Sequence, residues 1–272
     1  MKSVTNLRGM IFTKDCMFEP GELVIEDGII KEVQICDYEA LTQKEQEQYL
    51  IPGLVDVHFH GAAGYDFCDG TQEAIAEMTK YELANGITSI NPATMTLGEN
   101  TLLQIAKTAA EYKNKKYSEG AELVGINMEG PFISLEKKGA QNPKYIHKPD
   151  AEVFDRLQSA AEGLFRLCAV APEEPGAMEF IDACRDKVAI SVAHTTADYD
   201  TAKEAFDRGA KQVTHLYNAM PSFSHRAPGV IGAACDSDCF VELICDGIHV
   251  HPSVIRTTFK MFGDDRIVLI SD

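Results

Sequence analysis

The sequence predicts an α/β protein: a (β/α)8 barrel of the TIM type, preceded by a small β-rich N-terminal segment. From residue 50 onward, short apolar runs typical of buried strands alternate with amphipathic stretches typical of helices. This alternation implies parallel strands joined by helical crossovers. Eight strand-like runs are present, the number that closes such a barrel, and the chemistry of a barrel gathers at the C-terminal ends of its strands.

Residues 1–49 hold short extended pieces instead of this alternation. In the run GELVIEDGIIKEVQI, the pair Asp27-Gly28 between two apolar alternations predicts a hairpin turn. We therefore expect residues 1–49 to form an incomplete β-sandwich segment and residues 50–272 to form the barrel.

The barrel strands are predicted to end near Val57, Asn91, Met128, Val170, Ala193, Thr214, Cys245 and Ser271. The predicted helices occupy residues 71–86, 99–116, 151–163, 177–187, 197–210 and 251–263, several with a glycine near the C-terminal end. The last apolar run ends two residues before the chain does. We therefore expect the eighth helix and the remainder of the small β domain to be missing.

The composition restricts the partners and the compartment. The 272 residues include 25 Lys and Arg against 42 Asp and Glu, and this net charge of −17 disfavours nucleic acid and anionic membranes as partners. No apolar run reaches the roughly 18 residues of a membrane span, and the N-terminus lacks the apolar region of a secretory signal. Eight cysteines without a C-x-x-C pair favour buried, reduced thiols of a cytoplasmic protein over disulfides or a zinc ribbon.

Metal-ligand side chains follow several of the predicted strands. His58 and His60 come directly after the first strand, and residues two apart in an extended strand point to the same face, so both imidazoles can reach one ion. Glu129 follows the third strand, His194 the fifth and His215 the sixth. Each histidine alone is typical of a hydrogen-bonded structural residue, and Glu129 alone of a surface carboxylate. Together at one rim of the barrel they predict a metal site.

Asp272 ends the eighth strand. A carboxylate at the barrel rim, facing a metal-activated water, suits a general base that later returns the proton to a leaving group. The alternative is a helix N-cap for the missing eighth helix.

Six segments together resemble one known family. Residues 51–61, IPGLVDVHFHG, resemble the first metal-binding strand of the amidohydrolase superfamily. Within it, the combination resembles the N-acetylglucosamine-6-phosphate deacetylase family, and the resemblance runs from about residue 20 to the last residue. The other five segments are NMEGPF (127–132), AHT (193–195), HLYNAM (215–220), HRAPG (225–229) and DGIH (246–249).

The resemblance implies roles for individual residues. Glu129, His194 and His215 match the ligands of the family's main divalent metal, and Asp272 matches its catalytic acid/base. It also implies a homodimer in which a phosphate contact comes from the neighbouring subunit. The positions that it implies for substrate binding are Ala140, Gln141, Asn218, Ala219, Arg226 and His249.

Two departures from the family pattern bear on the chemistry. Gln141 stands where some members keep a histidine near the substrate acetyl group, and glutamine can donate a hydrogen bond to a developing oxyanion but carries no charge. The pair His58 and His60 is complete, whereas relatives that use one metal can lack it. The number of metal ions per chain, one or two, is therefore left open. The ligand types suit zinc or iron, with manganese or cobalt as alternatives.

The family activity agrees with this residue set. The resemblance implies hydrolysis of the acetamide of N-acetyl-D-glucosamine 6-phosphate to glucosamine 6-phosphate and acetate, a step of amino-sugar catabolism. Arg226 offers a planar fork and His249 a second donor for a phosphate dianion. Three alternatives remain: the N-acetylgalactosamine epimer as substrate, another amide substrate of the superfamily, or an inactive chain that only binds metal or sugar phosphate.

Overall fold

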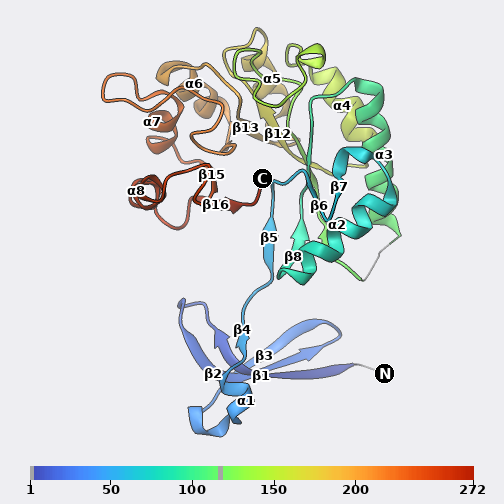
Figure 1. Ribbon diagram of the computed structural model, residues 1–272, viewed down its shortest axis with the longest axis vertical. Helices are drawn as coiled ribbons and strands as arrows, with labels where there is room; N and C mark the ends of the chain where they lie inside the picture. The colour runs from blue at the N-terminus through green and yellow to red at the C-terminus, as the bar shows by residue number, and fades with distance from the viewer. Residues whose placement is uncertain (1–2, 116–118) are drawn as a thin grey trace. The chain divides into compact units, whose positions relative to one another are not determined.

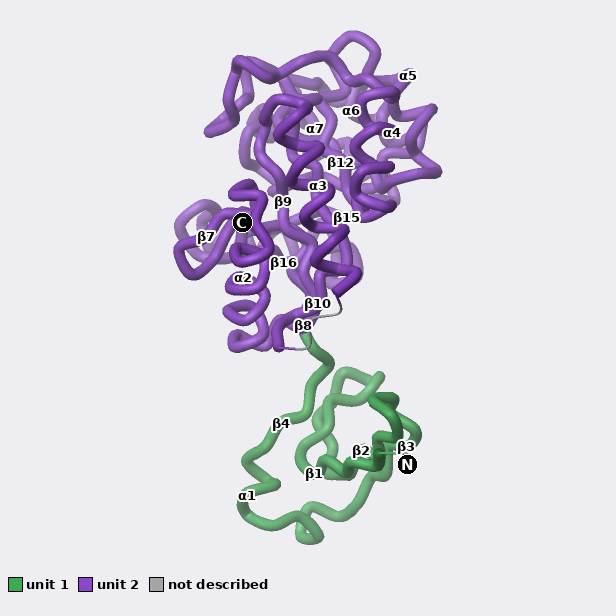
Figure 2. Tube along the Cα trace, turned by 90° about the vertical axis from the view of Figure 1, so that its right-hand side faces the viewer, with its two compact units in different colours: residues 1–53 green, residues 54–272 purple. Residues whose placement is uncertain are grey.

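The computed structural model describes residues 3–115 and 119–272, and the chain divides into two compact units, residues 1–53 and 54–272 (Figures 1 and 2). Each unit has its own sheet structure.

The first unit is built on one four-stranded sheet in the order β3-β2-β1-β4. Glu26 pairs with Ile29 across a two-residue turn, and the turn residues Asp27 and Gly28 have φ values of 51° and 78°. This backbone is typical of the tight turns that follow strand twist, and it confirms the predicted hairpin. The elements of this unit are β1 (Val4–Phe12), β2 (Phe18–Glu26), β3 (Ile29–Ile35), η1 (Tyr38–Ala40), α1 (Gln43–Gln46) and β4 (Tyr49–Leu50).

The boundary of this unit falls at Gly53, later than the expected boundary after residue 49. The reason is β4, which pairs in parallel with β1 through Met10 opposite Tyr49 and so ties residues 49 and 50 to the small sheet. The described residues of this unit form one sheet, and the expected sandwich stays a prediction.

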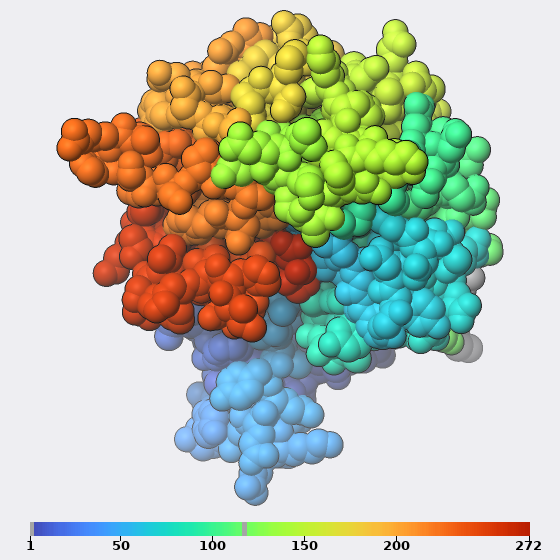
Figure 3. Space-filling view, turned by 45° about the horizontal axis from the view of Figure 1, so that its top comes forward, coloured from blue at the N-terminus to red at the C-terminus, as the bar shows by residue number. Residues whose placement is uncertain are grey.

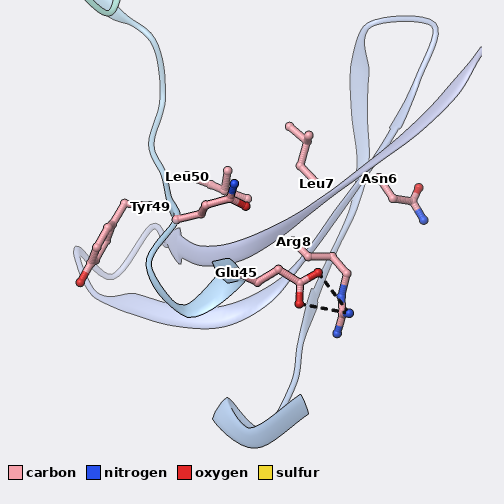
Figure 4. Close-up of a pocket in the computed structure, with 7 residues that line it drawn as sticks. Asn6, Leu7, Arg8, Glu45, Tyr49 and Leu50 are labelled. Carbon is pink, nitrogen blue, oxygen red and sulfur yellow. Dashed lines mark hydrogen bonds and ion pairs between the residues drawn. The ribbon is translucent and has the colours of Figure 1, made fainter. Parts of the chain in front are cut away.

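A surface cavity in the first unit is lined in part by Arg8 and Glu45, which form an ion pair (Figure 4). The Arg8 guanidinium lies 3.4 Å from a carboxylate oxygen of Glu45 and donates to the carbonyl of Ala40 at 2.9 Å. These contacts fasten the short helices η1 and α1 to strand β1, which is a structural role.

The second unit is a ring of parallel strands, and each of the eight predicted strands is present and ends within one residue of its predicted end. The second and third positions of the ring each hold two short strands, so the ladder is assigned as two sheets, β10-β8-β5 and β16-β15-β14-β13-β12-β11-β9. The strands are β5 (Leu54–Asp56), β8 (Ile87–Ile90), β9 (Ala93–Thr94), β10 (Glu122–Leu123), β11 (Ile126–Met128), β12 (Phe165–Val170), β13 (Ala189–Val192), β14 (Gln212–Val213), β15 (Phe240–Ile244) and β16 (Ile267–Ile270).

The ring closes where the last strand meets the first. The backbone N–H of Asp272 donates to the carbonyl of His58 at 2.9 Å, and the Ser271 hydroxyl donates to the Asp56 carboxylate at 2.5 Å. Figure 1 shows the C-terminal end of the chain beside the segment that follows β5. This junction confirms the predicted barrel.

Helices cover the outside of the ring (Figure 1). Several begin at the capping residues that the sequence offers: the side chains of Thr71, Asp150 and Asp198 accept backbone N–H groups at the starts of α2, α4 and α6. The last residue of the helix predicted over 99–116 lies outside the described residues. The helices are α2 (Gln72–Ala84), α3 (Glu99–Asn114), α4 (Ala151–Ala160), α5 (Ala177–Cys184), α6 (Tyr199–Arg208), α7 (Gly229–Cys235) and α8 (Pro252–Phe262).

The prediction missed helix α7 and the small hairpin of β6 (Gly61–Ala62) and β7 (Tyr65–Asp66). The α7 sequence GVIGAAC contains two glycines, which disfavour a helix, and burial among its neighbours overrides that preference. The short 3-10 helices η2 (Phe67–Asp69) and η3 (Pro143–Tyr145) were not predicted either.

The cysteine prediction is confirmed in part. All eight cysteines are free thiols. Cys168, Cys184 and Cys239 are buried as expected, and burial raises the pKa of Cys239 to about 12. Cys16 and Cys245, however, are exposed. Among the described residues, no helix is both long enough and apolar enough to cross a membrane.

Candidate metal centre

The predicted site residues of the barrel meet where the strands end. In the space-filling view of Figure 3, the last residues of the chain, in dark red, lie against the segments that follow β5 and β11. Two groups of three metal-ligand side chains lie within the described residues, and in each group the ligand atoms are within 4.8 Å of one another. One group is Glu129, His194 and His215, and the other is His58, His60 and Asp272.

The first group is centred on the buried carboxylate of Glu129. Its Oε1 atom lies 3.1 Å from Nε2 of His194 and 3.1 Å from Nε2 of His215, and these two nitrogens are 3.1 Å apart. His194 and His215 have φ values of 43° and 31°, a backbone region that non-glycine residues rarely adopt. Such turns at the strand ends direct both imidazoles toward Glu129, and uncommon backbone of this kind is concentrated at functional sites.

The second group also contacts Glu129 of the first group. Nε2 of His60 lies 3.1 Å from Oε2 of Glu129, and Nε2 of His58 lies 3.4 Å from Oε1 of the same carboxylate. Oδ1 of Asp272 is 3.6 Å from Nε2 of each of these histidines. Glu129 therefore contacts the histidines of both groups, four imidazoles in all.

The hydrogen bonds on the far side of the rings test whether a cation fits here. A neutral imidazole has one N–H donor and one lone pair. Nδ1 of His194 lies 2.8 Å from the carbonyl of Lys137, which can only accept, so Nε2 of His194 carries the lone pair. That lone pair faces a carboxylate, which repels it unless a proton or a metal ion lies between them. Nε2 of His58 is buried without a hydrogen-bond partner, as expected of a metal-ligand atom. The residue set fits a divalent cation.

The electrostatics of the centre favour positive charge. Burial raises the pKa of Glu129, but the four imidazoles of His194, His215, His58 and His60 lower it by more, and the net pKa lies well below the usual value. For His58, burial lowers the pKa while the Glu242 and Glu129 carboxylates raise it, and the net pKa lies well above the usual value. Both shifts mean that a positive charge between the imidazoles and the buried carboxylates is favoured.

Gln141 contacts the centre in a different way from the sequence expectation. Its side-chain amide donates to Oε2 of Glu129 at 2.6 Å, and its carbonyl accepts the backbone N–H of Thr96 at 2.6 Å. The amide donor is therefore engaged by Glu129 in this structure, where the sequence suggested a donor to a substrate oxyanion. Gln141 is buried, whereas its neighbour Ala140 is exposed.

Glu242 was missed by the sequence analysis, which treated FVELIC only as a strand. The side chain is fully buried, and one of its carboxylate oxygens lies 2.8 Å from Nδ1 of His58. A glutamate in the middle of an otherwise apolar strand was the signal that could have identified it.

The other four predicted substrate residues, Asn218, Ala219, Arg226 and His249, lie in loops after β14 and β15. The Asn218 amide donates to the carbonyl of His215 at 3.3 Å, and Ala219 has a φ of 52°. Arg226 is exposed, and within the described residues its guanidinium has one hydrogen bond, to His225. The structure does not bring Arg226 into contact with His249.

The side chain of His249 is held by Asp246. Nδ1 of His249 lies 2.7 Å from one Asp246 oxygen, and the other oxygen accepts the backbone N–H groups of Ile248 and His249. These hydrogen bonds lower the pKa of Asp246 to about 2. His251 caps helix α8, as expected of a residue at a helix start, and His147 and His225 are exposed.

Comparisons with known proteins identify the family of this chain. Residues 49–272 match the model of the amidohydrolase family. An N-acetylglucosamine-6-phosphate deacetylase of Bacillus subtilis is 38% identical over 270 residues, which cover 96% of this chain and 68% of that protein. An N-acetylgalactosamine-6-phosphate deacetylase of Escherichia coli O157:H7 is 30% identical, over 96% of this chain and 68% of that protein.

A solved structure of another such deacetylase has a similar fold. The N-acetyl-D-glucosamine-6-phosphate deacetylase of Mycobacterium smegmatis, solved as an Asp-to-Ala variant with N-acetyl-D-glucosamine 6-phosphate, superimposes with a TM-score of 0.88. It is 30% identical, and the match covers 98% of this chain and 70% of that one. This chain thus spans about two thirds of the length of its relatives.

A parallel barrel with paired histidines after its first strand and a carboxylate shared by four imidazoles defines a metal-dependent hydrolase of the amidohydrolase type. The chain belongs to the amidohydrolase family. Within that family, the relatives named above are deacetylases of N-acetylated amino-sugar phosphates.

Proposed function

We propose that this protein is a metal-dependent deacetylase that hydrolyses the acetamide of N-acetyl-D-glucosamine 6-phosphate to glucosamine 6-phosphate and acetate. The observation that carries the proposal is Glu129, a buried carboxylate that faces four imidazoles at the mouth of the barrel. The named activity of the Bacillus subtilis relative, at 38% identity, and of the Mycobacterium smegmatis protein, at 30% identity, supports the substrate. We place the reaction in amino-sugar catabolism in the cytoplasm, where free thiols are the rule.

We assign the ion ligands from the two groups of side chains. Glu129, His194 and His215 hold the main divalent ion, and His58 and His60 hold a second one. Imidazole and carboxylate ligands suit zinc or iron, with manganese or cobalt as alternatives. When bound, such an ion polarises an amide carbonyl and lowers the pKa of a coordinated water toward about 7.

Asp272 is the proposed acid/base. Its carboxylate lies at the rim of the barrel beside His58 and His60, and its side chain is 15% exposed, so it is open to water and to substrate. Oδ1 accepts a proton from the attacking water and then delivers it to the amide nitrogen. This second transfer matters because an amine leaves poorly without a proton.

The sugar phosphate is assigned to the loops after β14 and β15. Arg226 and His249 are exposed donors suited to a phosphate dianion, with Asn218 and Ala219 on the same loop as Arg226. Ala140 and Gln141, in the loop after β11, are assigned to the acetyl group of the substrate. We propose a homodimer, in which one phosphate contact comes from the neighbouring subunit, as the family resemblance implies.

One assay tests the activity and its closest alternative. Acetate release is measured on the 6-phosphates of N-acetylglucosamine and N-acetylgalactosamine, together with the metal content of the same sample. The second sugar is included because one relative is named for it. We expect metal-dependent release that is faster on the glucosamine epimer. Faster release on the galactosamine epimer would reassign the substrate. A metal-loaded protein that releases acetate from neither sugar would be a binding protein without the proposed activity.

Replacement of Arg226 by alanine is expected to raise KM for the 6-phosphorylated sugar. A charge-assisted hydrogen bond contributes about 1.5–3 kcal/mol, so we expect a roughly ten- to hundred-fold rise. The matched control is Arg256→Ala on helix α8, an exposed arginine that we assign no role in binding. Turnover of unphosphorylated N-acetylglucosamine should change little in either variant. Equal losses on both sugars in Arg226→Ala would show that Arg226 serves the fold.

The number of bound ions tests the second metal group. We expect two equivalents of divalent metal per wild-type chain, and one equivalent in His60→Ala, because His60 contacts only the second group and Glu129. Anomalous diffraction from metal-loaded crystals locates the ions. A single ion per wild-type chain, bound away from His58 and His60, would remove the second site from the proposal.

A further inference from the structure

The barrel interior holds a carboxylate that the mechanism above does not use. Glu242 lies in the middle of strand β15 and is 0% exposed. Val241, its neighbour, packs into the apolar cluster of the core. Because neighbouring residues of a strand point to opposite faces, Glu242 points into the barrel. A buried carboxylate without partners is strongly destabilising, so its contacts should explain its presence.

Those contacts reach both metal groups. Oε2 of Glu242 lies 2.8 Å from Nδ1 of His58 and accepts the backbone N–H of His215 at 3.1 Å. Oε1 accepts the side-chain amide of Gln212 at 2.5 Å. His58 and His215 belong to different metal groups, so one carboxylate oxygen fixes a ligand side chain of one group and the backbone of the other.

The contact with His58 determines which nitrogen of the ring is free. A neutral imidazole carries one N–H, and a carboxylate accepts it, so the proton is on Nδ1 and the lone pair is on Nε2. Nε2 is the atom that lies 3.4 Å from Glu129 and 3.6 Å from Asp272 and has no hydrogen-bond partner of its own. A carboxylate behind a metal-ligand histidine sets the ring orientation in this way and makes the nitrogen a stronger ligand.

The contact with His215 acts on the backbone. The φ of His215 is 31°, which is unfavourable for a residue with a side chain and must be maintained by its surroundings. The hydrogen bond from the His215 N–H to Glu242 is one such constraint, and it lies at the point where β14 ends and the imidazole turns toward Glu129.

We propose that Glu242 is the positioning residue of the metal centre: through one carboxylate oxygen it fixes the tautomer of His58 and the strained backbone of His215. This inference rests on the metal centre of the proposed function and does not depend on which sugar is the substrate.

The first test is a Co²⁺ titration of the full chain, followed by the visible absorption of the bound ion. In Glu242→Gln, the shape is kept but the charge is lost, and we expect the dissociation constant of at least one ion to rise by about ten- to a hundred-fold. The matched control is Ser191→Ala, which removes a buried hydrogen bond to Thr214 in the same barrel but touches neither metal group. The control should bind Co²⁺ as the wild type does.

The outcomes separate this inference from the proposed function. A Glu242→Gln variant that binds every equivalent with wild-type affinity would overturn the role of Glu242 alone. A wild-type chain that binds no Co²⁺ would overturn the metal centre and this inference with it.

The second test needs only a folded wild-type chain. Nitrogen chemical shifts of ¹⁵N-labelled histidine in the zinc-loaded protein report the tautomer of each ring, and the His58 signals are assigned by their loss in His58→Gln. We expect a proton on Nδ1 of His58 and a metal-bound Nε2. A proton on Nε2 would contradict the proposal even if every substitution of Glu242 failed to fold.

Discussion

Replacement of Asp272 by asparagine should lower kcat for acetate release by about 10²- to 10⁴-fold, the contribution usual for a positioned general acid/base. Asparagine keeps the size of the side chain but cannot take up the proton of the attacking water. The ion assigned to Glu129, His194 and His215 does not depend on Asp272, so at least one equivalent of metal should remain bound.

The control for this variant is Asp264→Asn, which removes an exposed carboxylate from the loop before β16. It should leave both kcat and metal content unchanged. Acetate release by Asp272→Asn at more than a tenth of the wild-type rate would refute the acid/base assignment. Complete loss of metal from that variant would instead make Asp272 a ligand that both ions need.

Replacement of Glu129 by glutamine should have the largest effect on the ions themselves. Glu129 contacts all four histidines of the centre, so its loss weakens both groups at once. We expect metal content near zero at a metal concentration that saturates the wild type. Loss of several kcal/mol of transition-state stabilisation corresponds to a fall in kcat/KM on the order of 10³-fold or more.

Glu82→Gln is the matched control, since Glu82 is also a buried glutamate of the barrel, on helix α2, and burial raises its pKa. Metal content measured by emission spectroscopy should be at the wild-type level in Glu82→Gln. A Glu129→Gln variant that retained both ions would show that the histidines hold them without the shared carboxylate.

The sequence was sufficient for the barrel because strand and helix signals are local. The apolar run before each strand end and the glycine near the end of several helices lie within a few positions of the elements that they define. The same locality placed His58, Glu129, His194 and His215 at strand ends, and the parallel arrangement then brought them to one rim.

Contacts between distant segments could not be predicted in this way. Glu242 and His58 are 184 residues apart, and nothing near Glu242 in the sequence indicates which side chain it meets. The partner of Gln141 depends on the path of the loop between Glu129 and η3, which has no periodic pattern. Helix α7 forms against its own propensity because its residues are buried.

The junction of the first and last strands has a consequence for the order in which this protein folds. The Asp56–Ser271 hydrogen bond joins residues 215 positions apart, so it closes nearly the whole second unit into one loop. Contacts of such long range cost chain entropy before they return any stabilisation, and they tend to form late. His58, His60 and Asp272 stand at this junction. An ion held there would bind the closed ring and not the open one, so a higher concentration of the free ion would shift the equilibrium toward the closed ring.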